Sequence, residues 1–233
     1  MTELDRALAL VGSLSPEDKQ AVLRYLRQNL PLHPMEERLK ASAETLLEAI
    51  KRASPLTVRG IEGILAEASF ATEVVPTLAG WTEVSPPPDA AYDFLLTDGS
   101  SDPPIQVQVK MQRRKNHQPW MASQAMTSSR SWPADHYVVE VQRTRGGADS
   151  AGKGTRPYRF GEFDILAVSL GAAKGHWRHF MYTVARWLLP EPADPTQILK
   201  LQPVAPVDND DWTTNFVTAA KWHRSSVART IAG

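Results

Sequence analysis

The chain of 233 residues contains no cysteine. This absence excludes a disulfide framework and any zinc site that uses cysteine ligands. It is typical of proteins in a reducing compartment, so we expect a cytoplasmic location. No apolar run approaches the ~18 residues of a membrane-spanning helix, and residues 1–6 carry acids where a signal peptide has a basic start.

An excess of charge is also missing. The 26 Lys and Arg residues balance 26 Asp and Glu residues, so overall composition points to no particular partner. The glycines between residues 146 and 154 lack the Gly-Lys-Ser/Thr ending of a phosphate-binding loop, and there is no Gly-x-Ser-x-Gly nucleophile motif. His176 and His179 do not complete a zinc motif. These absences argue against P-loop nucleotide hydrolases, serine-nucleophile hydrolases and zinc enzymes.

The first 55 residues are predicted to form a helical N-terminal part. Ser15 and Pro16 are a typical helix start, with acids in the following turn. A further helix is expected from Met35 to Ala53, with an inward apolar stripe. Residues 56–233 are predicted to form an α/β domain, in which helices flank a central mixed β-sheet.

The most informative stretch of that domain runs from Tyr92 to Lys110. Its two ends are predicted strands, because residues 92–97 are mainly aromatic and aliphatic and residues 105–110 alternate strictly between apolar and polar. Between them lies a turn rich in Asp, Gly, Ser and Pro. The resulting hairpin would bring Asp93, Gln108 and Lys110 together on one face.

Carboxylate and amide oxygens bind hard cations such as Mg²⁺, and a neighbouring lysine can orient a water or stabilise charge on a phosphate. The stretch resembles the PD-(D/E)xK nuclease superfamily, which includes many restriction endonucleases. The resemblance implies that Asp93 and the backbone carbonyl of Val109 bind Mg²⁺, that Gln108 assists as a neutral ligand, and that Lys110 positions the attacking water. No proline precedes Asp93, and Gln108 replaces the usual acid.

The superfamily also often supplies a glutamate from the helix before the first strand. A helix is predicted over residues 57–72, with positions 60, 64, 67, 71 and 74 on one face. Glu67 lies on this otherwise apolar stripe, where an unpaired charge is costly. The resemblance therefore favours Glu67 as a further catalytic residue, with Glu73 as the alternative.

A local excess of basic residues begins at the same strand. Residues 110–159 contain ten Lys or Arg and three acids, as a groove for a phosphodiester substrate would require. We assign contact with double-stranded DNA to Arg113, Arg114, Lys115, Arg143, Arg145, Arg156 and Arg159.

The sequence thus predicts a Mg²⁺-dependent, sequence-specific endonuclease of the type II restriction enzyme kind. A homodimer is expected, because a two-fold recognition site matches a two-fold protein. Two alternatives stay open: a DNA-binding protein with a degenerate nuclease fold, and a nuclease for repair or modified DNA.

Overall fold

The computed structural model describes residues 1–30, 33–125, 132–143 and 156–231. Two compact units are present, Met1–Val58 and Arg59–Gly233. None of the helices in these described segments combines the length and apolar character that crossing a bilayer would need.

The first unit is helical. It contains α1 (Glu3–Ser13), α2 (Pro16–Asn29), α3 (Pro34–Leu39) and α4 (Ala43–Arg52). The Ser15 hydroxyl accepts a hydrogen bond from the Asp18 amide, which confirms the predicted start of α2. The single helix expected from residue 35 to 53 is wrong, because Lys40 has a left-handed φ of 51° that ends α3. Of the inward stripe expected there, Ala43, Leu46 and Ile50 are half-buried, whereas Leu39 and Leu47 are exposed.

The second unit is built around a mixed five-stranded sheet. Its strands are β1 (Thr82–Val84), β2 (Phe94–Thr97), β3 (Ile105–Met111), β7 (Ile165–Ser169) and β8 (Phe180–Val184), in the order β1-β2-β3-β7-β8. β3 and β7 are parallel, and every other neighbouring pair in this sheet is antiparallel. A mixed sheet with flanking helices confirms the predicted fold class.

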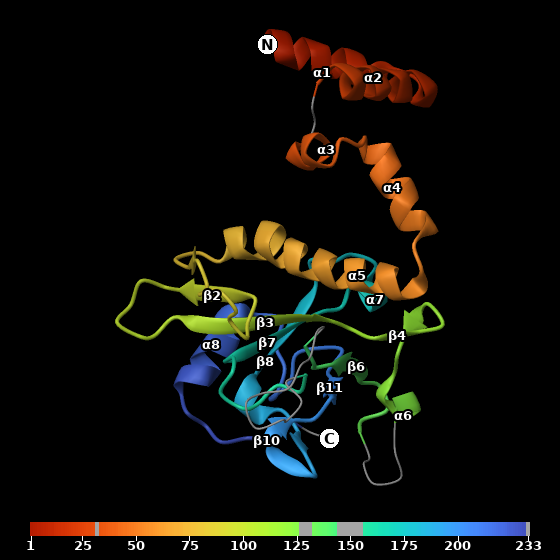
Figure 1. Cartoon of the computed structure of the whole chain (residues 1–233). Coiled ribbons are helices and arrows are strands. Elements are labelled where there is room, and N and C mark those ends of the chain that lie inside the picture. Colours follow the sequence, from red (N-terminus) through yellow and green to blue (C-terminus); the bar gives the residue numbers. More distant parts are fainter. Residues whose placement is uncertain (31–32, 126–131, 144–155, 232–233) are drawn as a thin grey trace. The chain divides into compact units, whose positions relative to one another are not determined.

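One face of the sheet packs against helices. Here α5 (Pro55–Ser69) lies along β2 and β3 (Figure 1) and continues as a π-helical turn (Phe70–Val74) and a 3₁₀ turn (Val75–Thr77). α8 (Phe216–Arg224) contributes to the same core cluster. The strict alternation of β3 explains the orientation of its side chains, because Ile105, Val107 and Val109 all enter this cluster.

The helix α5 is confirmed, but its predicted face is only partly right. Val74 of that face is buried, whereas Ile64, expected to point inward, is 63% exposed, and Ala66, Ser69 and Phe70 are also buried. Phe70 packs 4.9 Å, centroid to centroid, from Phe94 on β2. The tertiary packing of this aromatic pair thus sets which face of α5 meets the sheet.

The other face of the sheet packs against shorter elements. A second core cluster joins Leu166 and Val168 of β7 to Val139, Trp187 and Trp212. The short elements of the unit are β4 (Arg114–Lys115), β5 (Gln118–Pro119), α6 (Ala122–Ala125), β6 (Tyr137–Glu140), α7 (Gly171–Lys174), a 3₁₀ turn (Ala185–Trp187), β9 (Pro190–Glu191), β10 (Asp194–Ile198) and β11 (Leu201–Val204). β6 pairs with β11, β4 with β5, and β9 with β10.

The last helix begins after Asn215, whose side chain caps it by accepting from the Thr218 amide at 3.1 Å. Asp208 closes the preceding loop by accepting from the Thr214 amide at 2.8 Å. Arg224, at the other end of α8, donates to Asp98 at 2.6 Å and so holds the turn of the β2–β3 hairpin.

Candidate active site

The β2–β3 hairpin places Asp93 directly beside β3. Phe94 pairs with Val107, and the Asp93 amide donates to the Val107 carbonyl at 3.0 Å. The pairing of β2 with β3 ends here. The next amide on this edge of β3, that of Val109, donates to the Asp93 carboxylate at 2.8 Å. The side chain of Asp93 therefore accepts a hydrogen bond from the part of the β3 edge that β2 leaves unpaired.

Gln108 is the residue that connects this edge to the rest of the site. Its side chain is buried, with 1% of the residue exposed. The amide nitrogen donates to the Asp93 carboxylate and, at 3.1 Å, to the Val109 carbonyl. Its amide oxygen accepts from the Tyr158 hydroxyl at 2.9 Å. The Asp93 carboxylate oxygen and the Val109 carbonyl oxygen thus point to the same position, and the amide nitrogen of Gln108 occupies it.

Lys110 lies on the same face of β3 as Gln108. Its ammonium nitrogen is 5.5 Å from the centroid of the Tyr158 ring, a distance at which the ring face attracts a cation. Burial lowers the pKa of the Lys110 ammonium, and the carboxylates of Asp93, Glu67 and Glu140 oppose that change. Lys110 is therefore a half-buried cation that interacts with the charges of three acidic side chains.

The pKa values of the two carboxylates near Lys110 are raised, whereas that of the lysine is lowered. Burial raises the pKa of Asp93, while the Lys110 charge and the hydrogen bond from Val109 lower it. Burial also raises the pKa of Glu67, Asp93 raises it further, and Lys110 opposes the rise. Glu67 on α5 thus feels the charges of both hairpin residues.

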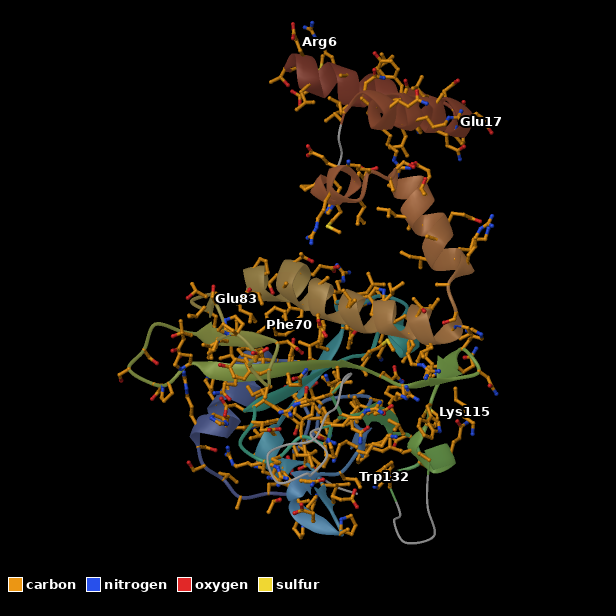
Figure 2. All side chains as sticks on the ribbon, in the orientation of Figure 1. Arg6, Glu17, Phe70, Glu83, Lys115 and Trp132 are labelled. Carbon is orange, nitrogen blue, oxygen red and sulfur yellow. The ribbon has the colours of Figure 1, made fainter. Side chains whose placement is uncertain are left out.

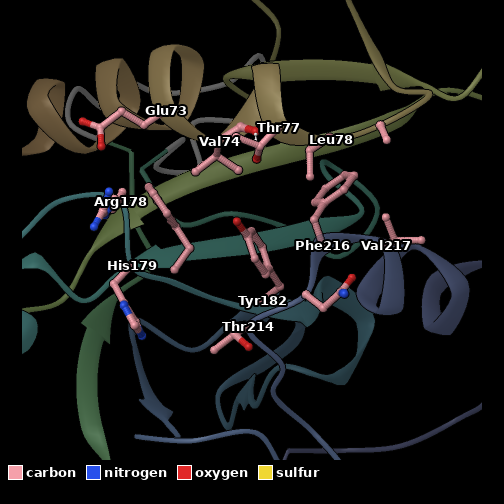
Figure 3. A pocket seen from close by; sticks show the side chains of 13 residues that line it. Glu73, Val74, Thr77, Leu78, Arg178, His179, Tyr182, Thr214, Phe216 and Val217 are labelled. Atoms are coloured by element: carbon pink, nitrogen blue, oxygen red, sulfur yellow. Dashed lines mark hydrogen bonds between the residues drawn. The ribbon is translucent and has the colours of Figure 1, made fainter.

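The alternative glutamate lies elsewhere. Glu73 belongs to the π-helical turn and lines an open pocket of 430 Å³ together with Arg178, His179 and Tyr182 (Figure 3). Asp93, Gln108 and Lys110 do not line this pocket. The influence of the Asp93 charge on Glu67, together with the separate pocket beside Glu73, therefore favours Glu67 over Glu73 as the neighbour of Asp93.

The oxygen donors of this site suit a hard cation. Asp93 and Glu67 supply carboxylates, Val109 supplies a carbonyl, and Gln108 supplies an amide oxygen if its side chain rotates. Mg²⁺ prefers such ligands and commonly uses one or two carboxylates. Among the described residues no group of three or more His, Asp or Glu side chains gathers into a metal cluster, so the side chains supply few charged ligands.

The residues assigned to DNA contact differ in their ion pairs within the chain and in their exposure. Four of them pair with acids of the chain: Arg113 with Glu140 (3.3 Å), Arg114 with Glu62 (2.6 Å), Arg143 with Glu162 (2.7 Å) and Arg159 with Asp194 (4.0 Å). Lys115 is exposed on β4, at the hairpin that follows β3 (Figure 2), and Arg156 is also exposed. Arg145 and the glycine-rich loop lie outside the described residues.

Tyr158 is the site residue that the sequence did not single out. It is 4% exposed, and its ring also lies 5.1 Å from the guanidinium carbon of Arg143. Burial, followed by the charge of Asp93, raises the pKa of its hydroxyl, so Tyr158 is a neutral hydrogen-bond donor. The only sequence signal was its place in the segment Arg156-Pro157-Tyr158-Arg159, between two basic residues.

No protein-family model matches the chain, and no curated protein matches it. A solved structure of a bacterial homing endonuclease is similar, with a TM-score of 0.36 and 16% sequence identity over 71% of this chain and 91% of that one. This likeness is too low to assign a fold family or a function, which must come from the residues of the site.

Proposed function

We propose that the chain is a Mg²⁺-dependent endonuclease that cuts double-stranded DNA at specific sequences. The observation that carries the proposal is the joint environment of Glu67 on α5, Asp93 immediately before β2, and Lys110 near the end of β3. Two half-buried carboxylates beside a half-buried lysine suit the hydrolysis of a phosphodiester.

Each residue of the site has a proposed role. Asp93 and the Val109 carbonyl hold the cation, Gln108 contributes its amide oxygen after rotation, and Glu67 completes the negative charge. Bound Mg²⁺ would act as a Lewis acid that stabilises the leaving oxygen. Lys110 orients the attacking water and stabilises charge on the phosphate. Tyr158 keeps the lysine in place through its ring.

DNA recognition is assigned to the basic residues around the site. Exposed Lys115 and Arg156 suit phosphate contacts, which position DNA without reading its sequence. Arg143 is held by Glu162 close to Tyr158, so its guanidinium is pre-organised for a bidentate contact with a base edge or a phosphate. We further propose a homodimer, because a two-fold DNA site requires two copies of the active site.

One observation favours a second candidate, a DNA-binding protein with a degenerate nuclease fold. The N–H₂ group of Gln108 already satisfies both Asp93 and the Val109 carbonyl. A site whose oxygens are satisfied without a cation has less need to bind one, so DNA binding without cutting is the competing function.

The deciding experiment is digestion of unmethylated and methylated plasmid DNA with the full chain in Mg²⁺ or EDTA. The proposal predicts discrete bands in Mg²⁺ and none in EDTA, with Lys110→Ala inactive and the exposed-lysine control Lys174→Ala active. Binding without cutting would support the degenerate fold. A smear, or cutting only of methylated plasmid, would point instead to a repair or modified-DNA nuclease.

A further inference from the structure

Tyr158 and Gln108 together form an arrangement that the proposed roles above do not explain. Gln108 uses its nitrogen for the two oxygens assigned to the metal, and its oxygen for the Tyr158 hydroxyl. A cation cannot share those two oxygens with an N–H donor directed at the same point, because the donor hydrogens occupy the position of the cation. Metal loading therefore requires the Gln108 amide to turn.

We propose that Tyr158 is a positioning residue that latches the Gln108 amide across the metal ligands and thereby controls metal loading; this inference rests on the proposed metal site. The Tyr158 hydroxyl is the donor that fixes the amide with its oxygen away from Asp93. Both side chains are buried, at 4% and 1% exposure, so neither readily exchanges its partner for water.

The direction of the effect follows from donors and acceptors. When the amide turns, its N–H₂ group donates to the phenolic oxygen of Tyr158, but the phenolic hydrogen must turn away and lose its acceptor in a buried environment. An unsatisfied buried donor opposes this turn in the parent protein. In Tyr158→Phe the hydroxyl is absent, so turning costs no phenolic hydrogen bond. Removing the hydroxyl should therefore make metal binding tighter, although it deletes a polar group next to the site.

The aromatic ring has a separate task that the same variant preserves. Lys110 and Arg143 lie 5.5 and 5.1 Å from the ring centroid, and a phenylalanine ring keeps both contacts. Tyr158→Phe thus isolates the hydroxyl. Tyr182 supplies the matched control, because it is similarly buried (3% exposed) but belongs to the core cluster on the α5 face of the sheet.

The test measures Mn²⁺ binding to the full chain without DNA, from the electron paramagnetic resonance signal of free Mn²⁺. Tyr158→Phe should bind Mn²⁺ about fivefold more tightly than the parent, the equivalent of one ~1 kcal/mol hydrogen bond, and Tyr182→Phe should match the parent. In a Gln108→Ala background, Tyr158→Phe should change nothing, because the hydroxyl acts only through the amide. Circular dichroism melting confirms that each variant is folded.

Unchanged or weaker Mn²⁺ binding by folded Tyr158→Phe would overturn the latch. An equal effect of Tyr158→Phe with and without Gln108 would overturn it too, because the hydroxyl would then act by another route. Failure of the proposed function looks different: Asp93→Asn would leave Mn²⁺ binding intact, or neither the parent nor Gln108→Ala would bind Mn²⁺. In that case the metal site itself is wrong, and the latch falls with it.

Discussion

Replacing Gln108 by glutamate puts a hydrogen-bond acceptor where the parent has the donor at the centre of the site. In the parent, an N–H₂ group meets the Asp93 carboxylate and the Val109 carbonyl. In Gln108→Glu, an oxygen of the same reach meets the same two acceptors. The side chain is almost fully buried, so solvent cannot screen the conflict.

The variant has two ways to accommodate this conflict, and their magnitudes decide between them. If both carboxylates stay charged, the pair costs ~4 kcal/mol at a separation of ~4 Å and an effective dielectric constant of ~20. The lost charged hydrogen bond adds ~2 kcal/mol. If the glutamate instead takes up a proton, it becomes a donor to Asp93. With an ordinary carboxyl pKa of about 4.3, that uptake costs ~4 kcal/mol at pH 7 and ~1 kcal/mol at pH 5. Proton uptake is therefore the cheaper route at both pH values.

The sign of the pH dependence follows from this route. The new carboxyl has a higher pKa in the folded chain than in the unfolded chain. Its folded, protonated form is stable below the unfolded pKa, and that stability is lost as pH rises towards the folded pKa. We therefore expect Gln108→Glu to be ~1 kcal/mol less stable than the parent at pH 5 and ~4 kcal/mol less stable at pH 7. Millimolar Mg²⁺ should shrink the loss at pH 7, because a cation replaces the proton between the oxygens.

Urea unfolding at the two pH values, in EDTA and in Mg²⁺, measures these differences. Gln106→Glu is the matched control, because Gln106 lies two residues away on the same face of β3, and its backbone pairs with Leu95. It should show neither the large pH dependence nor rescue by Mg²⁺. If Gln108→Glu resembles Gln106→Glu in EDTA at both pH values, the Gln108 amide does not contact Asp93, and the arrangement of Asp93, Gln108 and Val109 is wrong.

Three further outcomes are expected. Lys110→Ala should lose cleavage by at least 100-fold in a plasmid assay yet retain DNA binding in a gel-shift assay, because phosphate contacts are spread over many basic residues. Glu67→Gln should slow cleavage at least tenfold, whereas Glu73→Gln, whose side chain lines a separate pocket, should cut at the parental rate. Arg224→Ala should unfold at lower temperature than the parent at pH 7, and the difference should narrow on acidification. The reason is that hydrogen bonds from Arg224 depress the pKa of Asp98, so their contribution is present at neutral pH and is lost as pH falls.

The β2–β3 hairpin of this site could be predicted, because the alternation of apolar and polar residues indicates a strand and its two faces. Residues 105–110 alternate apolar and polar side chains, so their faces follow from the period of a strand. The turn chemistry of residues 98–102 then specifies a hairpin, and Asp98 accepts from the Ser100 amide at 3.2 Å as a turn former should. The juxtaposition of Asp93 with Gln108 follows from these local rules alone.

The contacts that give the site its chemistry could not be predicted in the same way. Tyr158 reaches Gln108 across a sequence separation of 50 residues, and no local pattern encodes such a contact. The orientation of α5 was missed for a related reason. Its helical period allows several faces, and the packing of Phe70 against the sheet selects one of them. Glu67 feels the charge of Asp93, although only part of the stripe used to find it packs inward, so its candidacy rests on the family resemblance rather than on periodicity.

The basic residues of the segment 110–159 show the same limit of local reasoning, and it affects the expected DNA binding. The ten basic residues between 110 and 159 outnumber the acids of that segment, but the partners of Arg114, Arg143 and Arg159 are Glu62, Glu162 and Asp194, all from outside it. A local excess therefore overstates the number of free cations. DNA must either use the exposed Lys115 and Arg156 or draw arginines away from these acids. The second route costs the energy of each ion pair, so any base contact made by Arg114, Arg143 or Arg159 has to repay that energy. Phosphate contacts by Lys115 and Arg156 carry no such cost, which separates a cheap source of affinity from a costly source of specificity.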